Sequence, residues 1–273
     1  MNNLFGFQAG DSMIHRLTGT TKLITFLVLT LAGMLSFDLR YLVALALLAS
    51  FTLKLAHIKW QDIALMVKLV AVFAVMNLVL IYLFAPQYGV TLFHHQTILL
   101  GSGGYALTLE QLVYEFIVLI KYFFTLPLAL VFLLTTNPSE FAAGLNKIGV
   151  SYRIAIAFSL TLRYIPDIQA EYWMVANAQQ ARGFEMSKKA SFRQRIKGAA
   201  GIVMPLVFSS LNRIDEISRA MDLRRFGKGK RRTWYFAQVL TRRDYLVLLL
   251  MVGLVLIDLI LIGVDGGRYW YPF

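Results

Sequence analysis

Two segments of this chain share one plan: Ala178-Gln-Gln-Ala-Arg-Gly-Phe184 and Ala220-Met-Asp-Leu-Arg-Arg-Phe-Gly227. Each places an arginine, Arg182 or Arg224, at the end of a long helical pattern. A glycine follows one to three residues later, and glycine readily adopts the left-handed conformation that closes a helix. The sequence therefore predicts two helices that end in the same way.

The arginines at these two ends have two interpretations. A guanidinium held at a helix end, beside a small residue that lets two surfaces approach, is suited to docking in an acidic groove of another protein. Alternatively, Arg182 and Arg224 only complement the negative C-terminal ends of their helices, which is worth roughly 0.3–1 kcal/mol. Because the same ending occurs twice, after two long amphipathic helices, we favour the docking interpretation.

Two long helical patterns lead to these ends. The first, Ser151–Arg182, contains Pro166, and the second, Ser191–Arg224, contains Pro205. Proline removes a backbone donor and clashes with the preceding turn, so each is expected to kink its helix. Apolar residues recur at steps of three and four along both patterns, which suits two helices that pack against each other. A helix of this length reaches about 48 Å, so the pair is predicted to form a lever whose ends meet a soluble partner.

Composition indicates a membrane protein. The 273 residues are 58% hydrophobic, include 20 Phe and 13 Tyr, and have a mean hydropathy of +0.63, which is too apolar for an ordinary soluble domain. The absence of cysteine excludes disulfides, thiol nucleophiles and cysteine-bound metals. Residues 135–243 hold 19 Lys and Arg against 7 Asp and Glu, and so account for the whole net charge of +12. The tendency of cytoplasmic segments to be basic explains this excess more simply than nucleic-acid binding does.

Five segments are predicted as membrane spans, since a helix needs about 20 mostly apolar residues to cross a bilayer. They are Thr21–Phe37, Tyr41–Leu55, Ile63–Phe84, Leu109–Leu134 and Asp244–Val264. The first two are short and joined by a tight turn, so they are expected to form a helical hairpin or an incompletely spanning pair. The sequence thus predicts an all-α integral membrane protein with about five transmembrane helices.

The basic residues of the connections set the orientation. The loop 85–108 has no Lys or Arg, whereas basic residues precede the first span and lie between the second and third. We therefore expect a membrane domain at 1–134, a cytoplasmic coupling domain of long crossing amphipathic helices at 135–243, and a last transmembrane helix with an external C-terminus at 244–273. The N-terminus is expected to be cytoplasmic, and Lys228–Arg232 is expected to lie against anionic headgroups.

Charged residues within or near the spans are expected to pack or to neutralise one another, because none of the spans carries a polar stripe. Asp258 is a candidate partner of Lys68 or Lys121. The adjacent His94 and His95 of the external loop would point in different directions on a regular element, so a surface loop is favoured over a metal site.

The sequence carries no recognisable catalytic motif. Gly227-Lys-Gly-Lys230 lacks the spacing of a phosphate-binding loop, so ATP must be handled by another subunit. No His, Asp and Glu have metal-ligand spacing, and no nucleophile is paired with a base. The chain is therefore expected to be non-catalytic. Two alternatives stay open: a membrane-embedded enzyme acting on lipid, and a membrane scaffold whose basic segment binds lipid or nucleic acid.

Further motifs accompany the two arginine segments between about His15 and Gly227. They are His15-Arg-Leu17 with Lys22-Leu-Ile24, Thr136-Asn-Pro-Ser-Glu140, and Leu162-Arg-Tyr-Ile-Pro166. On these residues the chain resembles the transmembrane (T) component, EcfT, of energy-coupling factor (ECF) transporters, a class of ABC transporter. The first arginine segment, which follows the Arg-x-x-Pro element, is the most specific of these motifs.

The resemblance implies two coupling helices whose Ala-Arg-Gly-type ends dock on two cytoplasmic ABC-type ATPases, of the EcfA and EcfA′ type. Arg182, between Ala181 and Gly183, matches the first coupling arginine, and Arg224 matches the second. The resemblance also implies a bacterial cell membrane location and a substrate-binding membrane partner, the S component, that takes up a vitamin or other micronutrient. ATP and Mg²⁺ would be bound by the ATPases, and no cofactor by this chain.

The second arginine segment departs from the pattern of this family. It reads Leu223-Arg224-Arg225 where the common pattern is Ala-Arg-Gly, so the central arginine is kept and its small neighbours are not. We therefore expect the two ATPase contacts to differ, which would suit two non-identical ATPases.

Overall fold

The computed structural model describes residues 10–101, 103–183, 192–226, 234, 238–265, 267 and 269–270. This part of the chain is helical apart from one two-stranded sheet, so the predicted all-α fold is confirmed. The chain divides into two compact units. We call Met1–Gly144 with Gln238–Phe273 the membrane unit, and Leu145–Ala237 the crossed-helix unit.

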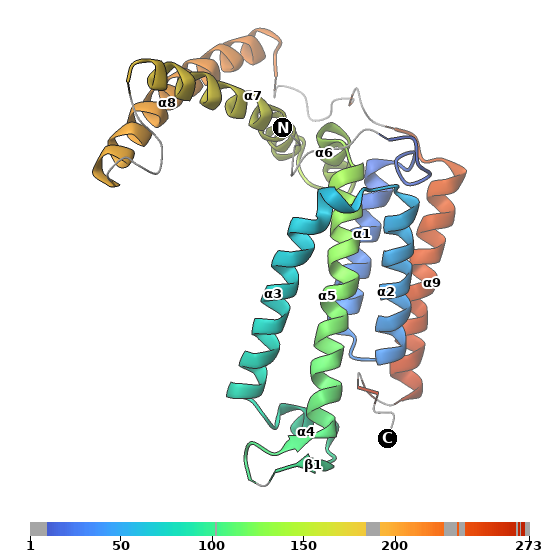
Figure 1. Ribbon diagram of the computed structural model, residues 1–273. Helices are drawn as coiled ribbons and strands as arrows, with labels where there is room; N and C mark the ends of the chain where they lie inside the picture. The colour runs from blue at the N-terminus through green and yellow to red at the C-terminus, as the bar shows by residue number, and fades with distance from the viewer. Residues whose placement is uncertain are drawn as a thin grey trace. The chain divides into compact units, whose positions relative to one another are not determined.

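Figure 1 shows the elements of each unit. The membrane unit contains α1 (Gly19–Leu35), α2 (Leu39–Leu55), α3 (Trp60–Phe84), α4 (Tyr88–Phe93), β1 (Ile98–Leu100), β2 (Leu107–Thr108), α5 (Leu109–Thr135) and α9 (Arg242–Val264). The crossed-helix unit contains α7 (Tyr152–Ala181) and α8 (Phe192–Leu223). The boundary between the units falls inside α6 (Pro138–Lys147).

Three of the helices in the described ranges are long and apolar enough to cross a membrane. These are α3, α5 and α9, with 25, 27 and 23 residues. In contrast, α1 and α2 have 17 residues each, which corresponds to about 26 Å and falls short of the ~30 Å hydrocarbon core. The five predicted spans thus correspond to three full-length helices and one short pair.

Side-chain caps explain where helices of the membrane unit begin. Thr18 precedes α1, and its hydroxyl accepts a hydrogen bond from the N–H of Thr21 (3.4 Å). Asp38 precedes α2 and accepts from the N–H of Arg40 (2.9 Å). Thr108 caps α5 in the same manner. Each cap satisfies one of the backbone donors that a first helical turn leaves unpaired.

The core of the membrane unit lies around α5, which packs against α1, α2 and α3. Its centre is Phe124 of α5, a fully buried side chain that shares one cluster with Leu29 of α1 and Leu42 of α2. Gly33 of α1 is so close to this ring that a Cβ there would lie 2.4 Å from Cζ of Phe124. The missing side chain of Gly33 therefore lets α1 approach α5.

Replacing Gly33 by alanine should lower the melting temperature of the detergent-solubilised protein. The new methyl group must displace a buried ring, and overpacking of this kind typically costs about 1–3 kcal/mol. The matched control is Gly253→Ala on α9, because a Cβ at Gly253 meets nothing within 4 Å. The control should hold or raise the melting temperature, and equal behaviour of the two variants would contradict the packing argument.

Two buried lysines join α1 and α5 reciprocally. Near the start of α1, Nζ of Lys22 donates to the carbonyl of Thr135 at the end of α5 (2.7 Å). On α5, Nζ of Lys121 donates to the carbonyl of Met34 near the end of α1 (2.8 Å) and lies 3.6 Å from the ring centroid of Phe37. The last carbonyls of a helix carry partial negative charge and have no partner within it. Each lysine therefore neutralises the C-terminal end of the neighbouring helix.

The expected pairing of Asp258 with Lys68 or Lys121 is wrong. Lys121 donates to the carbonyl of Met34 near the end of α1, and no ion pair joins Asp258 to a lysine among the described residues. Lys68 is exposed on α3, which packs on α5, while α9 packs on α1. The helix that carries Asp258, α9, and the helix that carries Lys68, α3, therefore pack on different helices, as Figure 1 shows.

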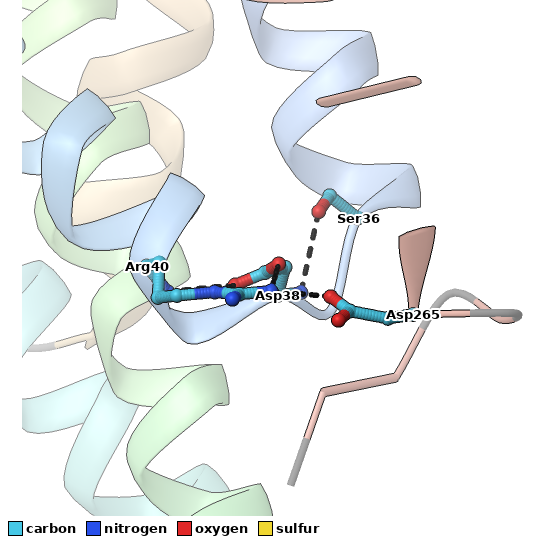
Figure 2. Close-up of polar contacts among 4 residues, drawn as sticks. All are labelled: Ser36, Asp38, Arg40 and Asp265. Carbon is cyan, nitrogen blue, oxygen red and sulfur yellow. Dashed lines mark hydrogen bonds and ion pairs between the residues drawn. The ribbon is translucent and has the colours of Figure 1, made fainter. Parts of the chain in front are cut away.

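An ionic cluster fastens the end of α9 to the turn between α1 and α2 (Figure 2). Nη2 of Arg40 lies 2.7 Å from Oδ2 of Asp38 and also pairs with Asp265, the C-cap of α9. The N–H of Asp38 donates to the hydroxyl of Ser36 (3.3 Å), and Cζ of Arg40 lies 4.3 Å from the ring centroid of Trp270. One guanidinium therefore holds together segments that are far apart in the sequence.

Candidate functional site

The two helices that carry the arginine segments pack against each other as an antiparallel pair. Near the end of α7 and the start of α8, Nε2 of Gln179 donates to the carbonyl of Gly201 (3.2 Å). Earlier in α7 and later in α8, Oε2 of Glu171 (α7) lies 2.9 Å from Nη2 of Arg213 (α8). The order of these contacts shows that α7 and α8 run in opposite directions, and Figure 1 shows the two helices crossing.

The space between these helices is apolar. It includes a hollow of about 220 Å³ lined by Tyr172, Val203, Leu206, Val207, Ser210 and Leu211. Beside it, Ala176 of α7 and Ile202 of α8 are almost completely buried. The two helices thus pack against each other as predicted, but Val207, Leu211 and Ile214 of the predicted apolar face of α8 keep 46%, 52% and 56% of their surface exposed.

Both predicted kink residues lie inside their helices. Pro166 is within α7 and Pro205 is within α8, and each helix continues on both sides of its proline. The second helical pattern is therefore one continuous element of 32 residues. A bend at either proline stays a prediction.

The first arginine segment ends α7 in a tight turn. Arg182 is the C-cap, and its N–H bonds to the carbonyls of Ala178 (3.3 Å) and Gln179 (3.1 Å). Gly183 follows with a φ of 86° and donates to the carbonyl of Gln180 (2.9 Å). The left-handed glycine closes the helix as the sequence predicts. Ala181, Arg182 and Gly183 are all exposed, and Phe184 lies outside the described residues.

The second arginine segment ends α8 in a turn of the same kind. The N–H of Arg224 donates to the carbonyl of Ala220 (3.2 Å), and the N–H of Phe226 donates to the carbonyl of Met221 (2.9 Å). The left-handed residue is Arg225, with a φ of 53°. The expected closure by a glycine is therefore wrong at this end: the candidate, Gly227, lies outside the described residues, and an arginine stands where α7 has Gly183.

The two ends lie at opposite ends of the crossed pair. The ring of Phe226 lies 5.7 Å from that of Tyr152, the first residue of α7, so the end of α8 is beside the start of α7. Leu223 and Arg224 are exposed, and Leu223 keeps 86% of its surface accessible. Each end thus presents a guanidinium to the surroundings. Lys228–Arg232, expected at the headgroups, lies outside the described residues.

Arg225→Gly should stabilise the end of α8. The left-handed conformation costs a residue with a side chain about 1 kcal/mol or more, and glycine removes this cost. Glycine also makes the unfolded chain more flexible, which offsets part of the stabilisation, so we expect a net stabilisation of roughly 0.5–1 kcal/mol. The measurement is amide hydrogen exchange of peptides that cover residues 216–226. Arg224→Gly is the matched control, because Arg224 does not adopt the left-handed conformation and a glycine there should speed exchange. Faster exchange in both variants would contradict the strain argument.

Both ends are exposed. Among the residues that the structure describes, no group of three or more His, Asp or Glu could hold a metal ion. What the ends offer is positive charge, donor geometry for carboxylates, and exposed apolar surface at Leu223.

The fold is that of an all-α membrane protein with a pair of crossed helices, and comparison with known proteins identifies the family. The sequence matches the family of cobalt transport proteins (CbiQ) over residues 10–235, and the chain belongs to this family. The energy-coupling factor transporter transmembrane protein EcfT of Bacillus subtilis is 25% identical over 257 residues, which cover 91% of this chain and 93% of that protein. The EcfT protein of Streptococcus equi is 31% identical over 254 residues, which cover 89% and 90%.

A different kind of relative matches only part of the chain. A putative ABC transporter ATP-binding protein of Bifidobacterium longum is 35% identical over 125 residues, which cover 43% of this chain but only 16% of that protein. Most of that relative therefore lies outside the similarity.

Proposed function

We propose that this chain is the energy-coupling transmembrane subunit of an ECF-type transporter. It would link ATP hydrolysis by two cytoplasmic ABC-type ATPases to the uptake of a vitamin or other micronutrient by a membrane S component. One observation carries the proposal: α7 and α8 end in turns of one geometry, each with an exposed arginine at the cap, at opposite ends of an antiparallel pair.

The separation of the two ends supports two docking partners rather than one. With 30 and 32 residues, α7 and α8 are each about 45–48 Å long. Because the helices are antiparallel, their C-terminal ends are separated by a distance of this order. Two ATPase subunits placed side by side would each receive one arginine, and the rigid pair would transmit their movement.

Nucleotide would be bound by the partners. This sequence has no phosphate-binding loop, so ATP and Mg²⁺ belong to the ATPases, and this chain takes part through its docking surfaces alone. The Bifidobacterium longum relative supports the association, because a protein named for ATP binding there contains a segment similar to this membrane protein.

The charges support an orientation with the crossed helices in the cytoplasm. The connection 85–108, between α3 and α5, has no Lys or Arg, while 135–243 carries the entire net positive charge. Positive segments stay on the cytoplasmic side. The chain would thus be a multi-pass protein of the bacterial cell membrane, with α7 and α8 reachable by cytoplasmic ATPases.

The two ends differ in a way that supports two non-identical ATPases. Gly183 leaves the surface beside Arg182 open, whereas Arg225 and Leu223 flank Arg224 with bulk, charge and apolar surface. Cysteines placed at Arg182 and Arg224 should cross-link to different ATPase subunits. Cross-linking of both positions to a single type of ATPase would contradict this asymmetry.

Affinity purification tests the proposal as a whole. The tagged chain, extracted in mild detergent, should bring down ABC-type ATPases and a small membrane protein that binds a micronutrient. Recovery of the chain alone, or transport and ATP hydrolysis by the isolated chain, would overturn the proposal.

A further inference from the structure

The connection between α3 and α5 exposes a run of large apolar residues at its tip, beside the exposed polar residues 94–97. At its base, Thr108, Glu110 and Gln111 are completely buried. At its tip, β1 exposes Ile98, Leu99 and Leu100 in succession. Three large apolar side chains exposed in succession are unfavourable in water. The surroundings of the tip are therefore expected to be apolar.

The base is rigid, because its buried polar groups are bonded to the backbone of the connection. Both carboxylate oxygens of Glu110 accept from the N–H of Thr97 (3.0 Å each), and Oε1 of Gln111 accepts from the N–H of Gly89 (2.9 Å). Gly89 is pressed against this base, since a Cβ there would lie 2.5 Å from the carbonyl oxygen of Glu110. The exposure of the tip is thus fixed by the fold.

The exposed tip continues an apolar surface of the membrane unit. We call this surface the hairpin patch, and it consists of Phe84, Tyr88, Ile98, Leu99, Leu100 and Tyr105. Phe84 is the last residue of α3, one of the helices long enough to cross a membrane, and the hydroxyl of Tyr82 in α3 donates to the carbonyl of Tyr105 (2.9 Å). Figure 1 shows α4 and β1 beside the ends of α3 and α5. The hairpin patch therefore extends the lipid-facing side of α3.

Length and composition place this patch at the bilayer surface. With 25 and 27 residues, α3 and α5 extend about 38–40 Å, several ångströms beyond the ~30 Å hydrocarbon core. The residues 85–108 contain no Asp, Glu, Lys or Arg, and tyrosines at 82, 88 and 105 have the amphipathic character favoured at headgroup level. An uncharged apolar tip at this depth fits lipid, whereas a charged rim would be expected around a polar partner.

We propose that the hairpin patch binds the lipid surface: β1 lies in the headgroup layer with Ile98–Leu100 against the acyl chains. It would hold the end of α3 and the start of α5 at a fixed depth in the membrane. This inference is independent of the arginine ends, because it depends only on the membrane unit.

Site-specific fluorescence tests the proposal cleanly, because the chain has no cysteine of its own. Leu100→Cys, which is 71% exposed and so tolerates a label, would carry an environment-sensitive fluorophore in lipid nanodiscs, where both membrane faces are accessible. Leu69→Cys, exposed in the middle of α3, is the lipid control, and Asp222→Cys, exposed on α8, is the water control.

The label at position 100 should be quenched by lipids that carry a nitroxide near the headgroup, more than by lipids that carry it near the end of the acyl chain. It should also be several-fold less sensitive to aqueous iodide than the label at position 222. Iodide quenching equal to that at position 222 would overturn the proposal. Protection from iodide without nitroxide quenching would overturn it as well, because the patch would then be covered by protein.

Discussion

Replacing Arg182 and Arg224 together by alanine is expected to abolish ATP-driven uptake and to release the ATPases from the membrane. Both arginines lie at exposed helix ends, where a partner can reach them. Truncating one member of a desolvated, hydrogen-bonded charge pair typically costs about 2–5 kcal/mol. Each substitution alone should therefore weaken ATPase binding by roughly 30-fold or more, and the double variant should show no measurable complex.

The measurement is ATPase recovery with the tagged chain, together with uptake in cells that express the complete transporter. The matched control removes two other positive charges of the same segment, Lys228→Ala with Lys230→Ala. If the crossed-helix unit bound its partner through diffuse positive charge, both double variants would lose affinity equally and salt would weaken binding strongly. Equal loss in the two variants would therefore refute a specific role for Arg182 and Arg224.

Sequence reasoning succeeded where the signal is local. The end of α7 could be predicted because an Ala-Arg-Gly segment after a long amphipathic pattern specifies both a cap and a left-handed closing residue, and Gly183 indeed has positive φ. The three long spans could be predicted from continuous apolar runs. In each case the physical cause lies within a few turns of one helix.

The features that the sequence did not predict depend on contacts between distant residues, or on a backbone conformation that is unfavourable for the residue type. Lys121 bonds to a carbonyl 87 residues away, so its partner follows from the packing of α5 on α1 and not from its neighbours. Arg225 adopts a left-handed conformation that is uncommon for a residue with a side chain, and no local rule placed it there. The sequence signal that was available is its alignment with Gly183: a residue at the position of a closing glycine is held to the same backbone geometry.

Asp244 is the strongest example of such a distant contact, and sequence reasoning missed its role. It is completely buried at the start of α9. Its Oδ2 accepts from the N–H and hydroxyl of Thr241 (2.7 and 2.6 Å), and its Oδ1 accepts from the N–H and hydroxyl of Thr18 (2.9 and 3.0 Å). Thr18 caps α1, 226 residues away in the sequence. One carboxylate therefore joins the starts of the first and last helices of the membrane unit.

Asp244→Ala is accordingly expected to lower the free energy of unfolding of the membrane unit by about 3–5 kcal/mol, because it leaves two backbone donors and two hydroxyls without their acceptor in a buried site. Asp244→Asn keeps one acceptor oxygen and should fall between alanine and the parent protein. Thermal unfolding in detergent measures both. Asp265→Ala is the matched control: that carboxylate also joins two helices, through Arg40, but it is partly exposed, and exposed ion pairs contribute only about 0–1 kcal/mol. A melting temperature for Asp244→Ala as high as that for Asp265→Ala would mean that α1 and α9 are held together by apolar packing alone.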